Sequence, residues 1–217
     1  KYANLYIPEK TIFFSSIINY QRLDLKENRL GVSNELYTGV KNTLIKSLFN
    51  EIESLTIIYS EYTKDLFHSY KKSAKQVGVE ILGQNISHNG IDYKKLNYSD
   101  GLILIADPLL LKDENSVITL FDKMREYKKP VFAYHKLFID VGATLVISVD
   151  SSIVGQQIAI MLKDYLKKKD IKKIQMPMGT TVIFNKKVAD EMKIEYNENA
   201  FSFINKVITK WVFQTRL

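Results

Sequence analysis

Several apolar runs in the sequence end in side chains that can hydrogen-bond, and these positions are the first candidates for chemistry. They carry hydroxyl, amide, carboxylate, imidazole and phenol groups, and they are Ser16, Asn19, Tyr59, Ser60, Asp107, Tyr134, His135 and Asp150. Each of these groups can donate or accept hydrogen bonds, which suits the recognition of a small polar molecule. The set therefore predicts a ligand-binding site.

Catalysis and metal binding find little support in the sequence. The histidines His68, His88 and His135 are scattered, and none has a second histidine or a carboxylate at the spacing of a metal site. Phosphate-loop, dinucleotide-binding and serine-hydrolase motifs are missing, and so is cysteine. Asp107 resembles the phospho-acceptor of a receiver domain, but the acidic pair that should end the first strand is absent. We expect a protein that is not an enzyme and that uses no cofactor and no metal.

Positioning the candidate residues requires a sheet, and the chain alternates between apolar runs and amphipathic stretches. The apolar runs predict strands over residues 10–17, 54–60, 79–86, 100–107, 130–135 and 143–149. Helical spacing predicts helices that begin at Ser33 and near residues 63, 116 and 152. Continuous apolar strands separated by helices are typical of parallel sheets covered on both faces. The fold class is therefore α/β and doubly wound, and ligands of such sheets bind at the carboxyl ends of the strands.

Asp107 is the leading candidate for ligand contact. It ends the apolar run GLILIAD, and Pro108 disfavours a helical conformation for the residue before it. A carboxylate held at this edge could accept a charge-assisted hydrogen bond from an amino group. The alternative is a turn-forming aspartate that accepts hydrogen bonds from nearby backbone amides.

Two of the predicted helices, those that begin at Ser33 and near residue 152, carry specific expectations about capping and packing. Ser33 should cap the first helix, with a buried stripe of Leu36, Val40, Leu44 and Leu48. Asp150 either contacts a ligand or caps the helix that follows it. In that helix, Gly155 should allow close packing against a neighbouring element.

Composition and charge narrow the class of protein. The 217 residues are 46% hydrophobic, and no apolar run approaches the ~18 residues of a membrane-spanning helix. The formal net charge is +7, with its densest cluster at Lys163–Lys173. That cluster indicates either a surface for nucleic acid or anionic lipid, or a solvated helix end whose lysines complement the helix dipole. Asp164 and Asp170 interrupt it and no recognition motif accompanies it, so we expect no nucleic-acid partner.

The last third of the chain carries a collinear set of residues, which are Lys129–Phe132, Gly142, Ala143, Asp150, Val154, Gly155, Ala159, Pro177, Ile183–Asn185 and Ala189–Ile194. This set resembles the pattern of the ABC-transporter substrate-binding family whose members include tryptophan- and tyrosine-binding lipoproteins. Upstream, Asn28, Gly31, Val32 and Ser33 are similar to the family's Asn-x-Thr-Gly-Val-Ser turn. Asn19 and Tyr20 stand where the family has Asp-Pro, and Met192-Lys193 where it favours Leu-Gly.

This resemblance implies the type I periplasmic-binding-protein fold, with two Rossmann-like lobes that close on a ligand. It places residues 1–31 and 136–177 in the first lobe, and residues 32–135 and 178–217 in the second. The family's first lobe normally begins with about three further strand–helix units, so we expect the first lobe to be incomplete here.

The implied function is an extracytoplasmic solute-binding protein, peripheral to the membrane, that delivers a small molecule such as an amino acid to an ABC transporter permease. One alternative is the ligand-sensing extracytoplasmic domain of a signalling receptor, whose partners would be signalling domains. A second is the core of a sugar-type transcription repressor, which requires a helix-turn-helix before residue 1.

Overall fold

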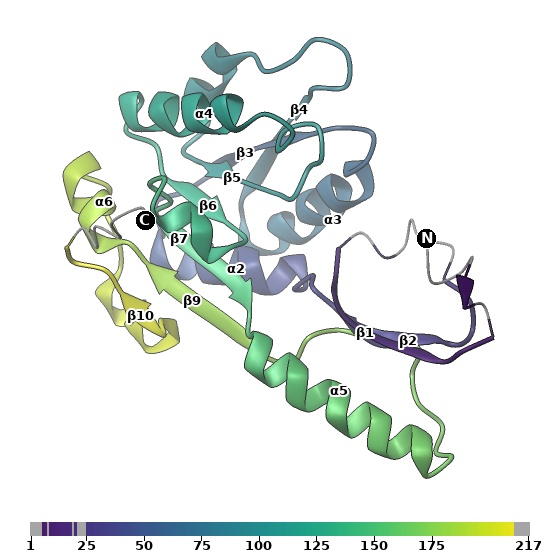
Figure 1. Ribbon diagram of the computed structural model, residues 1–217. Helices are drawn as coiled ribbons and strands as arrows, with labels where there is room; N and C mark the ends of the chain where they lie inside the picture. Colours follow the sequence, from purple (N-terminus) through teal and green to yellow (C-terminus); the bar gives the residue numbers. More distant parts are fainter. Residues whose placement is uncertain (1–5, 8, 19, 21–24, 211–217) are drawn as a thin grey trace, which may run out of the picture. The chain divides into compact units, whose positions relative to one another are not determined.

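The computed structural model describes residues 6, 7, 9–18, 20 and 25–210. The chain forms two compact units, which we call unit 1 and unit 2. Unit 1 comprises residues 1–37 and 149–180, and unit 2 comprises residues 38–148 and 181–217. The chain therefore passes between the units three times (Figure 1).

Unit 1 contains a small parallel sheet and one long helix. Its strands are β1 (Ile12–Ile17), β2 (Arg29–Ser33) and β8 (Ile174–Gln175), in the spatial order β1-β2-β8. Helix α5 (Ser151–Leu166) packs on this sheet, with Val154 and Met161 buried against Leu30 and Val32. One face of α5 thereby supplies the core of the unit.

Unit 2 is built on a larger sheet in the order β10-β9-β7-β6-β5-β3-β4. Its strands are β3 (Ser54–Tyr59), β4 (Glu80–Asn85), β5 (Leu102–Ile103), β6 (Val131–Ala133), β7 (Leu145–Val149), β9 (Thr180–Phe184) and β10 (Lys206–Val207). Strands β3 to β7 pair in parallel, so their carboxyl ends lie at one edge. Strand β9 runs antiparallel to β7, because Asn185 N donates to Thr144 O while Ser148 Oγ donates to Thr181 O.

Helices cover both faces of this sheet. They are α2 (Thr38–Leu48), α3 (Lys64–Ala74), α4 (Glu114–Glu126) and the short α6 (Lys186–Met192), with 3-10 turns η2 (Lys75–Val77), η3 (Tyr93–Tyr98), η4 (Lys136–Ile139) and η5 (Glu198–Phe203). Buried Leu120 and Phe121 of α4 pack on one face, in a core with Leu102 and Val146. On the α2 side, Phe49 meets Phe132 with ring centroids 5.2 Å apart. This two-faced cover confirms the expected α/β class, and Figure 1 shows the helices around the strands.

The first helix differs from the sequence-based prediction. Residues 29–33 form strand β2, which the sequence analysis took for a turn, and Ser33 is the buried last residue of that strand rather than a helix cap. Helix α2 buries Thr38, Asn42, Ile45 and Leu48. A strict four-residue spacing drifts around a helix of 3.6 residues per turn, and Val40 is accordingly 45% exposed.

The unit boundaries also differ from the expected lobes. Residues 136–148, expected in the first lobe, lie in unit 2, because β7 pairs with β6 through Leu145 opposite Phe132. Residues 32–37, expected in the second lobe, lie in unit 1, because β2 pairs with β1. Residues 178–180 also lie in unit 1.

Gly155 does not have the role expected of it. Among the described residues, nothing lies within 4 Å of a Cβ built on Gly155, so no neighbouring element in that part of the chain approaches the helix there. The residue lies on an exposed face of α5.

Candidate ligand-binding site

Asp107, after β5, joins two loops at the carboxyl edge of the unit 2 sheet. Its side chain is fully buried and accepts five hydrogen bonds. The donors are Ser60 N (2.8 Å), Ser60 Oγ (2.6 Å), Thr63 Oγ1, Leu109 N (2.9 Å) and Leu110 N (3.1 Å). This is the geometry of the turn-forming alternative, extended by two hydroxyl groups from the loop after β3.

The hydrogen bonds keep the Asp107 carboxylate ionised. Burial is the largest single influence and favours the neutral acid, but the hydroxyls of Ser60 and Thr63 and the amides of Leu110 and Ser60 outweigh it. The pKa of Asp107 is therefore lowered from its ordinary value. A buried charge held in this way fixes the loop from Ser60 to Thr63 against the sheet.

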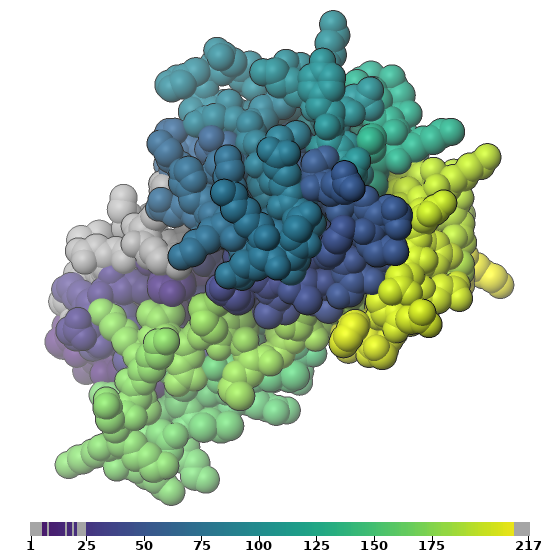
Figure 2. All heavy atoms as spheres, turned by 180° about the vertical axis from the view of Figure 1, so that it is seen from behind, coloured from purple at the N-terminus to yellow at the C-terminus, as the bar shows by residue number. Residues whose placement is uncertain are grey.

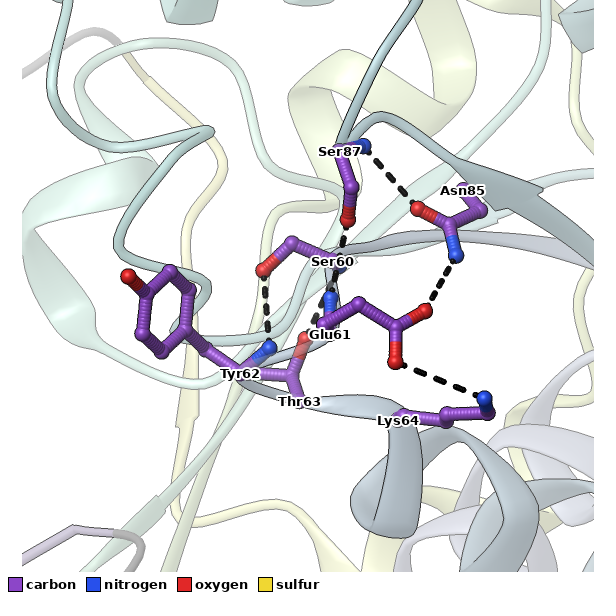
Figure 3. Close-up of polar contacts among 7 residues, drawn as sticks. All are labelled: Ser60, Glu61, Tyr62, Thr63, Lys64, Asn85 and Ser87. Atoms are coloured by element: carbon purple, nitrogen blue, oxygen red, sulfur yellow. Dashed lines mark hydrogen bonds and ion pairs between the residues drawn. The ribbon is translucent and has the colours of Figure 1, made fainter.

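Glu61 lies in that fixed loop and carries the one carboxylate among the residues drawn in Figure 3. Its Oε1 accepts from Asn85 Nδ2 at 2.9 Å, and its Oε2 accepts from Lys64 Nζ at 3.4 Å. Its backbone N donates to Ser87 Oγ at 3.0 Å, and Ser87 N donates to Asn85 Oδ1 at 2.9 Å. The side chain of Glu61 is nevertheless 56% exposed.

The electrostatics of Glu61 suit the binding of a cation. The hydrogen bond from Asn85, then that from Lys64, lowers the pKa of Glu61 below its ordinary value. Tyr62, the next residue, is 54% exposed, and in Figure 3 its ring points away from the Glu61 carboxylate. The loop therefore presents a fixed anion at this edge of the sheet.

The structure places the other predicted residues of unit 2 as follows. Tyr59 stacks on Phe67 of α3, with ring centroids 4.2 Å apart, and so contributes to packing. Tyr134, after β6, is half-buried, and this burial raises its pKa above the ordinary value. His135 accepts a hydrogen bond from Leu137 N at Nδ1 (3.2 Å) and thereby caps η4.

The remaining predicted residues belong to unit 1. Asp150 Oδ1 accepts from Ser152 N (2.9 Å) and Ile153 N (3.1 Å), so Asp150 is the N-cap of α5. Ser16 lies in β1, but its side chain is outside the described part of the structure, and Asn19 lies outside the described residues altogether.

Sequence reasoning missed Glu61, Asn85 and Ser87. Asn85 stood inside a predicted strand, and Glu61 came one residue after the position that was singled out. The parallel register of β3 and β4 pairs Tyr59 with Asn85, so the residues after both strands meet. The sequence did contain a signal for these residues, because polar side chains cluster at or just after the ends of two strands that could be expected to pair in parallel.

A pocket of about 260 Å³ opens elsewhere in unit 2. Its lining includes Lys136, Ile183, Asn185, Lys206 and Ile208, and none of the eight predicted site residues. Among the described residues, no cluster of three or more histidine, cysteine or acidic side chains could hold a metal ion. Within the same part of the chain, no helix has the length and apolar character needed to cross a membrane.

Three solved structures share the fold. A conserved domain protein from Vibrio cholerae has a TM-score of 0.64 and 19% identity, over 82% of this chain and 62% of that one. An ABC domain from Streptococcus pneumoniae in complex with L-Trp has a TM-score of 0.62 and 19% identity, over 82% of this chain and 63% of that one. A ligand-free, open substrate-binding protein with adhesive properties from Clostridium difficile has a TM-score of 0.69 and 17% identity, over 92% of this chain and 71% of that one. The chain thus spans less than two thirds of the first two structures.

These similarities and the two α/β units define the class as the type I periplasmic-binding-protein fold. The family model of the ABC transporter substrate binding protein matches residues 20–208. The chain therefore belongs to that family, as the sequence resemblance indicated. No curated protein matches it significantly.

Proposed function

We propose that this protein captures a small polar molecule of the amino acid class outside the cytoplasm and delivers it to an ABC transporter permease. The observation that carries the proposal is the Glu61 carboxylate, fixed by Asn85 and Lys64 at the carboxyl edge of the unit 2 sheet. In open α/β sheets this edge is where ligands bind.

The chemistry of the loop favours a ligand with an ammonium group. Glu61 is ionised and exposed, and a charge-assisted hydrogen bond to an ammonium group is stronger than a neutral one. The similar protein from Streptococcus pneumoniae, solved with L-Trp, supports the same ligand class.

Membership in a substrate-binding family supports a role in binding rather than catalysis, and a transporter rather than a receptor as the partner. Proteins of this kind work outside the cytoplasm, where they meet the permease at the membrane surface.

A thermal-shift screen of the twenty amino acids, with nucleosides and small organic acids as comparison sets, tests the proposal. A ligand that binds only the folded protein stabilises it by about 2.7 kcal/mol at 100 times its Kd. For a chain of this length, that corresponds to a rise of roughly 5–10 °C in Tm. A rise with one or more amino acids supports the proposal. If no amino acid shifts the Tm at millimolar concentration, the proposal is wrong.

A further inference from the structure

Three large aliphatic side chains in the last two turns of helix α5 are exposed to solvent. The buried side of the helix is formed by Val154, Gln157 and Met161. Ile160 is 61% exposed, Leu162 42% and Leu166 72%. Large aliphatic side chains gathered at one end of a helix at such exposures indicate an interaction surface.

The same end of the helix is strongly basic. Residues 160–173 hold six lysines against two aspartates. The lysines are Lys163, Lys167, Lys168, Lys169, Lys172 and Lys173; among the described residues, ion pairs join Lys169 to Asp164 (2.7 Å) and Lys173 to Glu27 (3.3 Å). In Figure 2 the green side chains of this region project into solvent.

The backbone turns at the end of α5, where several of these lysines lie. Lys168 adopts a left-handed conformation (φ 55°), and its N–H donates to Tyr165 O at 2.9 Å. Lys169 N donates to Asp164 O at 3.0 Å. The helix therefore ends in a turn directly after Leu166, and Lys167 and Lys168 lie in that turn instead of continuing the helix.

We propose that this surface, Ile160 to Lys173, binds the surface of a membrane rich in anionic phospholipid. Lysines attract anionic headgroups, while leucine and isoleucine side chains enter the boundary between headgroups and acyl chains. The apolar residues distinguish this partner from nucleic acid, which a basic patch alone would also attract but which offers no apolar phase to Ile160, Leu162 and Leu166.

The proposal does not depend on which ligand the protein carries. It would provide a contact with the membrane in which a transporter partner lies. It takes the lysine cluster as a binding surface, where the alternative is a solvated helix end.

Cosedimentation of the full chain with phospholipid vesicles tests the proposal. We expect binding to vesicles of phosphatidylcholine with 30% phosphatidylglycerol, little binding to phosphatidylcholine alone, and a steep loss between about 50 and 500 mM salt because surface charges are screened. The double variant Lys167→Gln/Lys168→Gln should bind roughly 30-fold more weakly, since each lysine near the surface contributes about 1 kcal/mol. The matched control is Lys71→Gln/Lys72→Gln on the exposed face of α3, which should bind as the parent does.

A second pair of variants tests the apolar component. Leu162→Ser/Leu166→Ser should weaken vesicle binding severalfold, whereas Ile118→Ser, at an equally exposed position of α4, should not. Three outcomes would overturn the proposal. The first is unchanged vesicle binding in both α5 variants. The second is binding to double-stranded DNA as tight as to vesicles and insensitive to Leu162→Ser/Leu166→Ser. The third is a dimer in solution that these leucine substitutions dissociate, because a second copy would then cover the surface.

Discussion

The hydroxyl of Ser60 donates a 2.6 Å hydrogen bond to the carboxylate of Asp107, 47 residues later in the chain. This bond joins the loop after β3 to the loop after β5 at the edge where ligands of α/β sheets bind. Asp107 is completely buried, so its contribution to the site is the position of the Ser60–Thr63 loop, which carries Glu61. The buried aspartate thus has a structural role, and the exposed glutamate is the residue that we propose for ligand recognition.

Asp107→Asn should lower the stability of the protein. The amide keeps one acceptor oxygen, but its NH₂ group then faces donors, and hydrogen bonds to a charged group contribute about 1.5–3 kcal/mol. We expect a loss of about 2–3 kcal/mol in the free energy of unfolding, measured by urea denaturation. Asp122→Asn, on the exposed face of α4, is the control and should change stability by less than about 0.5 kcal/mol. An Asp107→Asn variant with parental stability would contradict the structural role.

The stability that Asp107 contributes should depend on pH at the acid end. Its pKa is lowered in the folded state, so the contribution is fully present above the ordinary aspartate pKa of about 4. It is lost as the pH falls from there through the lowered folded-state value. The difference in unfolding free energy between the parent and Asp107→Asn should therefore be constant from pH 5 to 8 and narrow below about pH 4. A difference that narrows already between pH 7 and 5 would show that the folded-state pKa is raised instead.

Glu61→Gln should weaken ligand binding and leave stability nearly unchanged. The side chain is 56% exposed, and the glutamine amide retains an oxygen that can accept from Asn85. Loss of a charge-assisted hydrogen bond to a ligand ammonium group corresponds to about 1.5–3 kcal/mol, or roughly a 10- to 150-fold rise in Kd. Calorimetric titration with the ligand found by thermal shift measures this. Glu126→Gln, another exposed glutamate paired with a lysine, is the control. Equal affinities for Glu61→Gln and the parent would remove Glu61 from the site.

Asp150 can be assigned by comparing two substitutions. Asp150→Ala removes the cap of α5 and should cost about 1 kcal/mol, whereas Asp150→Asn keeps a good capping side chain and should cost little. If Asp150 acts only as a cap, neither substitution raises the Kd for ligand. A Kd raised by Asp150→Asn, with an unchanged Tm, would show that its charge contacts the ligand.

The sequence predicted the fold class because most of the strands are short apolar runs whose burial needs no knowledge of partners. It failed where structure depends on pairing between distant segments. Residues 29–33 resemble a turn locally, yet they form β2 because β1 and β8 flank them on both sides. The residues of strand β7 were expected in the first lobe, but the strand pairs with β6 and therefore lies in the sheet of unit 2.

The candidate site shows the same division. Asp107 and Ser60 could be identified because each ends an apolar run, but their hydrogen bond, which buries Asp107 away from solvent, could not. Glu61 and Asn85 are 24 residues apart, and only the register of β3 and β4 brings them together. The residue types at the strand ends therefore predicted which edge of the sheet carries the candidate site. The role of each side chain depends on its hydrogen-bond partners, which only the structure shows.

Two glycines should respond in opposite directions to the same substitution. A Cβ on Gly83 of β4 would lie 2.5 Å from Cζ of Phe67, a ring that is buried and stacked on Tyr59, so the ring would have to move. Overpacking of this kind costs about 1–3 kcal/mol, and Gly83→Ala should lower stability by that amount. Gly155 lies within α5 with nothing within 4 Å of its Cβ position, and alanine is the better helix former by roughly 0.5–1 kcal/mol. Gly155→Ala should therefore raise stability. Urea denaturation of both variants measures the contrast, and a destabilised Gly155→Ala would show that another element packs closely on α5, as the sequence alone had suggested.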